Sequence, residues 1–257
     1  MRTRPGRFRL NPRSPLADGL LFAGLPDNRF VGSLTYRDRS IYGRDGVLTG
    51  YAGAPLWQFD GDLGRWVLGF DGSNDYVVAP PTTTSRTVWT IAGWVKHVSG
   101  IAAFGLGDSG VRPDVALLPA RTGKVQIYIA DTYRDTGLAT PTGWFHAAIS
   151  RNGAAATTWI NGTAYSTPPT ADAPLGTFDL RLGRFCGVAQ YWAGQVADGL
   201  LYDRVLPPAD IRALSDPSNT LLRVGGVDGL LPQRTWWPAV VAPSFNPAWA
   251  QPTVVIQ

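Results

Sequence analysis

The middle of the chain shows the alternation of apolar and polar positions that is typical of β-strands. Val125, Ile127 and Ile129 alternate with Gln126 and Tyr128, and this period of two predicts a half-buried strand. Further apolar stretches predict strands over residues 88–98, 144–150, 155–160, 179–185 and 192–202.

Two Asn-Gly pairs join three of these strands. Asn152-Gly153 follows the strand over 144–150, and Asn161-Gly162 follows the strand over 155–160. Asn-Gly supplies the two positive φ angles of a type I′ hairpin turn. The sequence therefore predicts an antiparallel meander whose third strand runs through Tyr165.

One short helix is predicted between residues 206 and 214. Pro207 and Pro208 are tolerated at a helix start, Ile211 and Leu214 lie three positions apart on one face, and Pro217 ends the helix. Many strands with a single short helix indicate an all-β fold, an antiparallel sandwich or a jelly roll.

Composition narrows the chemistry that the chain can perform. All 19 acidic residues are Asp, since the sequence contains no Glu, and Cys186 is the one cysteine. An intrachain disulfide and a thiolate metal cluster are therefore excluded. A net charge of +4 over 257 residues is too small to indicate a nucleic-acid-binding protein.

Catalytic patterns are weak throughout the sequence. Asp60 and Asp62 have the spacing of two carboxylates on one strand face, but Gly61 and Gly64 beside them indicate a turn. His97 and His146 stand without a nucleophile motif, and the sequence contains no phosphate loop or zinc spacing. We therefore expect that the protein is not an enzyme.

Six short motifs occur in an order that resembles the laminin-G-like domain of the concanavalin A-like lectin/glucanase superfamily. They cover about residues 16–215, and the resemblance implies an antiparallel two-sheet jelly-roll sandwich. The motifs are Leu20–Ala23, Asp38–Ser40 with Gly43 and Gly46, Trp89–Lys96, Gly143–Ser150, Leu180–Gly183 and Gly194–Ile211.

The closing motif departs from the family pattern at two places. Its acidic pair falls on Ala197 and Asp198, which leaves one carboxylate. Pro207 replaces the serine that would cap the short helix, and such a cap contributes about 1 kcal/mol.

A calcium site is one interpretation of the segment FDGSNDYVVAP at residues 70–80. Asp71, Asn74 and Asp75 supply oxygen ligands of the kind that calcium prefers, and the resemblance implies Asp198 as a further ligand. The alternative is a tight turn in which these side chains bind their own backbone. The sequence favours the turn and leaves calcium as the second interpretation.

Glycan binding would require exposed aromatic side chains with polar neighbours. Tyr133, Tyr191 and Trp192 are candidates among the many aromatic residues of the chain. The resemblance also admits a host-surface glycan as ligand.

Two arms flank the predicted domain. Residues 1–15 form a basic arm, and residues 216–257 form an arm rich in Pro and Trp; neither has the repeating apolar face that a folded element needs. We predict that both arms bind neighbouring subunits. The partner-binding candidates are Arg2, Arg4, Arg7, Arg9, Arg13, Trp236, Trp237, Phe245 and Trp249.

A jelly roll with such arms resembles the accessory structural proteins of tailed-phage virions. We accordingly expect a non-enzymatic capsid decoration (cement) or tail-associated subunit whose partners are capsid or other virion subunits. The expected assembly is a homo-oligomer, and a trimer is the leading candidate. The alternative is a stand-alone bacterial carbohydrate-binding or adhesion module. The start of the sequence has no apolar signal region, and the sequence contains no apolar stretch long enough to span a membrane. The expected location is therefore a virion made in the host cytoplasm. Neither a membrane nor nucleic acid is an expected partner.

Overall fold

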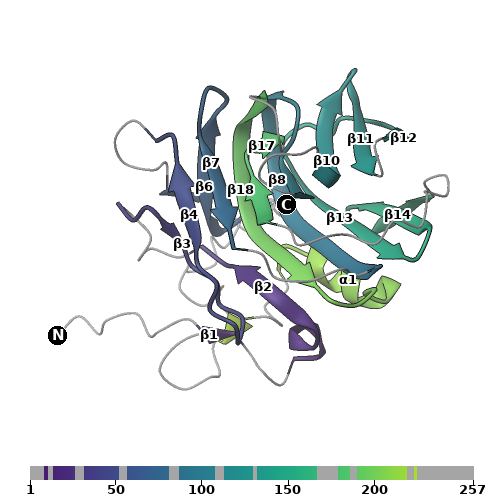
Figure 1. Cartoon of the computed structure of the whole chain (residues 1–257), viewed down its shortest axis with the longest axis horizontal. Helices are drawn as coiled ribbons and strands as arrows, with labels where there is room; N and C mark the ends of the chain where they lie inside the picture. Colours follow the sequence, from purple (N-terminus) through teal and green to yellow (C-terminus); the bar gives the residue numbers. More distant parts are fainter. Residues whose placement is uncertain are drawn as a thin grey trace, which may run out of the picture.

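Two antiparallel β-sheets enclose the main apolar core of the molecule (Figure 1). The computed structural model describes the following residues: 9–10, 14–26, 32–51, 57–80, 87–107, 113–129, 132–166, 179–185, 190–218 and 223–224. The all-β jelly-roll sandwich expected from the sequence is confirmed.

The first sheet has eight strands. Their order is β12 (Thr132–Ala139), β11 (Lys124–Ile129), β10 (Pro113–Arg121), β9 (Phe104–Gly107), β16 (Asp179–Leu182), β7 (Tyr76–Ala79), β4 (Gly46–Thr49) and β3 (Thr35–Tyr36).

The second sheet has nine strands and is built around β18 (Gln190–Tyr202). Seven strands follow the order β15 (Thr163–Ser166), β14 (Ala155–Ile160), β13 (Trp144–Asn152), β8 (Val88–Gly100), β18, β6 (Arg65–Asp71) and β5 (Trp57–Asp60). The remaining two, β2 (Leu20–Gly24) and β17 (Arg184–Phe185), also pair with β18. One edge of β18 binds β8 along most of its length, while the other edge binds β6 first and β2 afterwards.

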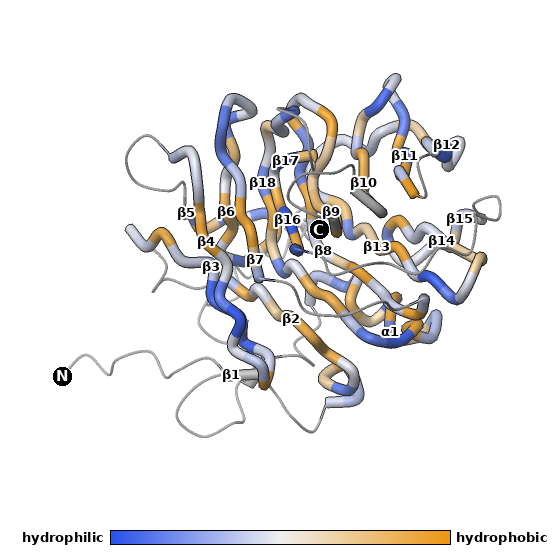
Figure 2. Tube along the Cα trace, viewed as in Figure 1, coloured by the Kyte–Doolittle hydropathy of each residue, from blue (hydrophilic) through white to orange (hydrophobic). Residues whose placement is uncertain are grey.

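The core between the sheets follows the period-two pattern read from the sequence. Val125, Ile127 and Ile129 are fully buried on the inner face of β11, and they pack with inward residues of both sheets. Figure 2 shows the same alternation as a change of colour from residue to residue along the strands. The outer side of β11 is covered as well, because Tyr128 packs there with Ala116, Leu118 and Phe185 in a separate buried cluster. β11 is therefore buried on both faces, and the prediction of a half-buried strand is wrong.

A smaller apolar cluster covers part of the outer face of the nine-stranded sheet. Ile211 and Leu214 of α1 (Pro208–Ser215) and Leu16 of η1 (Pro15–Ala17) pack there against Ala92 and Ala148. The predicted helix is confirmed. Pro207 stands at its N-cap and makes no side-chain hydrogen bond, as the departure from the family motif implied.

The two predicted hairpins are present, but one turn differs from the prediction. Asn161 and Gly162 both have positive φ angles, 49° and 76°, as a type I′ turn requires. In the other hairpin Asn152 pairs with Ala155, so Gly153 and Ala154 form the loop, and only Gly153 has a positive φ. The type I′ prediction for Asn152-Gly153 is therefore wrong by one residue, because Asn152 continues the ladder.

The predicted strand over 179–185 is divided by Gly183. Its φ is 82°, and a Cβ at this position would lie 2.3 Å from the Phe70 ring. The chain changes direction here, so that β16 belongs to the eight-stranded sheet while β17 pairs with β18.

The bases of the two arms meet in a short ladder. β1 (Arg9–Leu10) pairs antiparallel with β19 (Arg223–Val224). The domain boundaries at residues 16 and 215 stay a prediction. No helix among the described segments is long and apolar enough to cross a membrane.

Candidate functional site

One row of outward positions runs across the whole eight-stranded sheet. The register places these residues directly opposite one another from strand to strand, and we call them the outer row: Thr35, Val47, Val78, Arg181, Gly105, Ala116, Tyr128 and Tyr133. Aromatic rings stand at one end of the row, an arginine stands near its middle, and Gly105 contributes no side chain between them.

The β12 end of the outer row carries an exposed aromatic ring with a guanidinium stacked on it. Tyr133 is 41% exposed, and Cζ of Arg121 lies 3.5 Å from the centre of its ring. Nη1 of Arg121 donates a hydrogen bond to Oε1 of Gln126 (3.1 Å), and Tyr128 packs edge-on against Tyr133. We call Arg121, Gln126, Tyr128 and Tyr133 the Tyr133 cluster.

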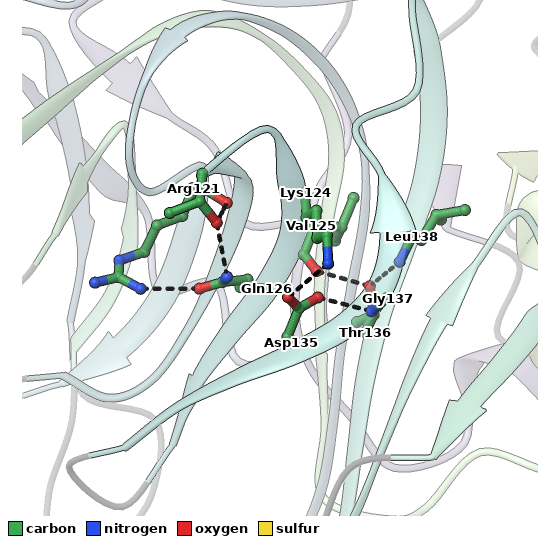
Figure 3. Close-up of polar contacts among 9 residues, drawn as sticks. Arg121, Lys124, Val125, Gln126, Asp135, Thr136, Gly137 and Leu138 are labelled. Atoms are coloured by element: carbon green, nitrogen blue, oxygen red, sulfur yellow. Dashed lines mark hydrogen bonds and ion pairs between the residues drawn. The ribbon is translucent and has the colours of Figure 1, made fainter.

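Polar contacts fix the surroundings of this cluster (Figure 3). Nζ of Lys124 lies 3.3 Å from Oδ2 of Asp135, and the backbone N–H of Gly137 donates to Oδ1 of the same carboxylate (2.7 Å). The hydrogen bond from Gly137, followed by the contact with Lys124, lowers the pKa of Asp135. The carboxylate therefore stays charged, and its cationic neighbour is already compensated.

Arg181 occupies the centre of the outer row. Its side chain is only 5% exposed, and Nη2 donates to Oδ2 of Asp179 (3.2 Å). Among the described residues Nε of Arg181 is buried without a hydrogen-bond partner, which is costly for a charged group.

A second aromatic group lies on β7 and the start of β18. The rings of Tyr76 and Tyr191 are 6.3 Å apart, and the guanidinium of Arg184 lies over both, at 5.0 and 5.5 Å from their centres. The face therefore repeats one arrangement, an arginine stacked on tyrosine, at two places.

The three aromatic candidates from the sequence separate in the structure. Tyr133 and Tyr191 belong to the two groups just described, whereas Trp192 is fully buried and donates to Nδ1 of His97 (2.9 Å). Trp192 is therefore part of the core, since its ring packs against Phe70 inside the sandwich.

The predicted calcium ligands are not all brought together. Asp71, Asn74 and Asp75 share one turn between β6 and β7, in which Oδ1 of Asp71 accepts from the N–H of Ser73 (2.8 Å) and Oδ2 of Asp75 accepts from the N–H of Asp71 (3.1 Å). Burial, followed by the nearby Asp71 carboxylate, raises the pKa of Asp75. This is the hydrogen-bonding pattern of the turn interpretation.

Asp198 lies elsewhere, on the outer face of the nine-stranded sheet. Asp71 pairs with Ala193, five residues before Asp198 along β18, which corresponds to roughly 16 Å. Asp198 forms a buried ion pair with Arg65 instead. In the described part of the chain no group of three or more such side chains is placed to hold a metal ion, so the four-residue calcium set is not assembled.

His146 lies beside this ion pair. Its ring packs edge-on against Trp94, and its Nδ1 is buried without a hydrogen-bond partner in the described part of the chain. Burial, followed by repulsion from Arg65, lowers the pKa of His146 to about 3. The imidazole is thus neutral and packed.

The predicted arm contacts fall almost wholly outside the described residues. Arg2, Arg4, Arg7, Arg13, Trp236, Trp237, Phe245 and Trp249 lie outside them, as does Cys186. The backbone of Arg9 alone is described, in β1.

Sequence reasoning did not identify Arg121, Gln126 or Arg181 as site residues. Gln126 occupies a polar position in the period-two pattern of its strand, and Arg181 lies between the inward-facing Leu180 and Leu182. Strand periodicity therefore shows that Gln126 and Arg181 point outward, but only the pairing order shows which residues of other strands lie beside them.

Comparison with known proteins identifies the fold. Residues 71–212 match the family model of the concanavalin A-like lectin/glucanases superfamily. A search of curated protein sequences finds no relative of the chain.

Solved structures of the same fold come from several organisms. Domain 4 of an extracellular arabinanase from Geobacillus stearothermophilus, solved with arabinotriose, has a TM-score of 0.58 at 18% identity and covers 77% of this chain and 98% of that one. A Trypanosoma rangeli sialidase in complex with sialic acid has a TM-score of 0.56 at 15% identity, covering 79% of this chain and 33% of that one. The binding domain of botulinum neurotoxin DC in complex with SialylT has a TM-score of 0.55 at 13% identity, covering 78% and 52%. The chain thus spans about a third of the sialidase and about half of the toxin chain.

Proposed function

We propose that this chain, which belongs to the concanavalin A-like lectin/glucanase superfamily, binds glycans at the Tyr133 cluster, at the β12 end of its eight-stranded sheet. The observation that carries the proposal is the Tyr133 cluster, where an exposed ring is surrounded by fixed donors and acceptors. Aromatic surface with a few oriented polar groups is the usual composition of a small-molecule site. The arabinotriose-bound and SialylT-bound structures of the same fold support a sugar ligand.

The arrangement of carboxylates supports a binding module and not a glycosidase. Among the described side chains of this face, Asp179 lies on β16 and Asp135 on β12, four strand spacings apart. At about 4.8 Å per spacing this is roughly 19 Å, whereas glycosidases place their two carboxyl groups about 5–9.5 Å apart. Asp60 caps the β5–β6 hairpin by accepting from the N–H of Leu63 (2.9 Å), which is a structural use of that carboxylate.

Glycan arrays and isothermal titration calorimetry test the proposal. Tyr133→Ala should weaken binding roughly tenfold, which corresponds to about 1.4 kcal/mol. Tyr42→Ala is the matched control, because Tyr42 is also exposed (46%) with an arginine stacked on it, Arg44 at 4.8 Å, but lies outside the outer row. A protein that binds no glycan on the array, or equal losses in both variants, would show that the proposal is wrong.

We also propose an assembly role, in which the protein is a virion accessory subunit whose arms grip neighbouring subunits. The pairing of β1 with β19 supports it, because both arms then leave the domain from one place. Sedimentation velocity of the full chain tests this role, with residues 16–215 as the comparison. An oligomer, expected to be a trimer, should form only with the arms. A full chain that sediments as a monomer would favour the stand-alone adhesion module.

A further inference from the structure

We infer that the edge strand β5 binds residues 253–256 of a second copy of this chain, which add one strand to the nine-stranded sheet. This inference rests on the proposed assembly role and names the surface that one arm binds. It follows from an aromatic pair exposed at the edge, from the one-sided pairing of β5 and from the residue pattern of the arm.

The β5–β6 hairpin ends in an exposed aromatic pair. Phe59 is 51% exposed, although it lies on the same strand face as Trp57, which is 7% exposed and belongs to the main core. Phe59 pairs with Trp66 of β6, and their rings lie 6.1 Å apart, edge to face. Trp66 is itself half-buried. The core-facing side of this hairpin therefore continues past the core and leaves apolar surface in contact with water.

The backbone of β5 is available for pairing on one side. β5 pairs with β6, and no other described strand pairs with it. The free edge of such a strand presents backbone N–H and C=O groups that can pair with another chain. Proteins usually protect these edges with charged residues, proline or very short strands.

The other edge strands of the two sheets have more of this protection. β12 carries Arg134 and Asp135, and β3 has two residues. The described side chains of β15 include no exposed large apolar residue. β5 has no proline and no charge before Asp60, its last residue. It is therefore the described edge that is most open to pairing through an apolar face.

The longest β-branched run of the arm over residues 216–257 matches this edge. Thr253, Val254, Val255 and Ile256 are consecutive β-branched residues, the class that is enriched in strands. This run lies outside the described residues. Proline recurs before it, at positions 217, 232, 238, 243, 247 and 252, and proline cannot donate to a ladder. Residues 253–256 are therefore the part of the arm best able to pair as a strand.

The alternation of side chains fixes how this segment would lie on β5. Successive residues of a strand point to opposite faces, so Val254 and Ile256 share one face and Val255 lies on the other. The more apolar pair matches the face that carries Phe59. Val255 then lies on the outer face with the exposed Gln58. In strand addition of this kind, main-chain hydrogen bonds give affinity and alternate side chains give specificity.

The arm is long enough to reach a second copy. Residues 225–252 separate the segment from β19, which is held by β1 at the base of the arms. A chain of this length spans up to about 90–100 Å when extended. A domain of about 200 residues has a radius of gyration of about 16 Å, so the span exceeds the width of the domain.

Sedimentation velocity of variants of the full chain tests the docking surface. Phe59→Ser should raise the dissociation constant of the oligomer roughly 10- to 30-fold, as expected when an aromatic anchor is removed from an interface. Removal of residues 253–257 should raise it at least as much. Ile41→Ser is the matched control, because Ile41 is 85% exposed but lies between β3 and β4. Melting curves that match the parent protein show that both substitutions keep the fold.

Disulfide cross-linking tests the strand pattern, in the full chain with Cys186→Ser to remove the native thiol. Gln58→Cys should form a disulfide between chains with Thr253→Cys or Val255→Cys, since opposite residues of paired strands have Cβ atoms about 4.5–5.5 Å apart. Val254→Cys, which faces the other way, is the control and should cross-link at least tenfold less. Non-reducing gel electrophoresis separates cross-links between chains from those within one chain.

The outcomes separate this inference from the assembly role. A cross-link between chains, with an oligomer that Phe59→Ser weakens, supports both. A cross-link within one chain overturns the second copy as the occupant of β5. An oligomer that Phe59→Ser leaves unchanged and that forms no cross-link overturns the inference and leaves the assembly role standing. A full chain that sediments as a monomer and forms no cross-link overturns both.

Discussion

The ion pair between Arg65 and Asp198 gives the most direct test of how this sandwich is held together. Both side chains are almost fully buried, 7% and 8% exposed. Nη2 of Arg65 also donates to the carbonyl of Pro217 (3.1 Å), and the guanidinium lies 5.7 Å from the Trp94 ring. The arginine therefore joins the β5–β6 hairpin, β18 and the segment after α1.

Arg65→Met should lower the free energy of unfolding by about 3–5 kcal/mol, because it leaves the Asp198 carboxylate buried without its cation. For a domain of this size, this corresponds to a fall in Tm of roughly 6–20 °C. Asp198→Asn should also destabilise the protein, but it keeps a residue that tolerates the positive φ of 54° at this position.

Urea unfolding of the two single variants and of the double variant measures the coupling between the charges. The double variant should be less destabilised than the sum of the singles, because neither charge remains buried alone. Lys124→Met, which removes the exposed Lys124–Asp135 pair, is the control and should leave the transition unchanged. If Arg65→Met behaves like this control, the ion pair does not hold the three elements together.

Three further predictions concern individual positions. Gly183→Ala should lower the free energy of unfolding by about 3 kcal/mol or more, since its Cβ would lie 2.3 Å from the Phe70 ring at a φ of 82°. Gly123→Ala is the control: its φ is 75° and nothing lies within 4 Å, so it should lower that free energy by about 1 kcal/mol. Equal losses in urea unfolding would contradict the role of the contact with Phe70. The free energy of unfolding should fall as the pH drops from about 6.5 toward 3, because His146 binds a proton in the unfolded chain but not in the folded one, where its pKa is about 3. The fall approaches about 1.4 kcal/mol per pH unit. A His146→Gln variant with the same pH dependence would refute the assignment of this effect to His146. Asp71→Asn should preserve the turn, because an amide oxygen can accept the same N–H bonds; a Tm that rises with calcium in the parent protein and not in the variant would favour the metal interpretation instead.

The sequence predicted the architecture because residues that face the core between the two sheets recur at every second position of strands such as β11. Val125, Ile127 and Ile129 show this in β11, and the Asn161-Gly162 turn fixes the hairpin that follows β14. The shift of the other turn to Gly153-Ala154 could not be predicted, because ladder pairing at Asn152 outweighs the local preference of Asn-Gly.

The candidate site was predicted less completely. Tyr133 was identified by residue type alone. Arg121 stacks on it and bonds Gln126, but these contacts depend on the register of β10, β11 and β12, which strand periodicity alone does not give. The role of Asp198 could not be predicted for the same reason. Its family motif suggested a metal ligand, whereas its partner Arg65 lies 133 residues away and was visible only in three dimensions.

The central position of β18 has a consequence for how the protein is made. β18 fills the gap between β8 and β6, so both of these strands must wait for residues 190–202 before their edges are paired. At a synthesis rate of about 5–20 residues per second, β8 leaves the ribosome roughly 5–20 s before β18 does. During this interval the nascent chain exposes two long, apolar, unpaired edges. Chaperone binding and aggregation during synthesis should therefore be concentrated in the interval that ends when Tyr202 emerges.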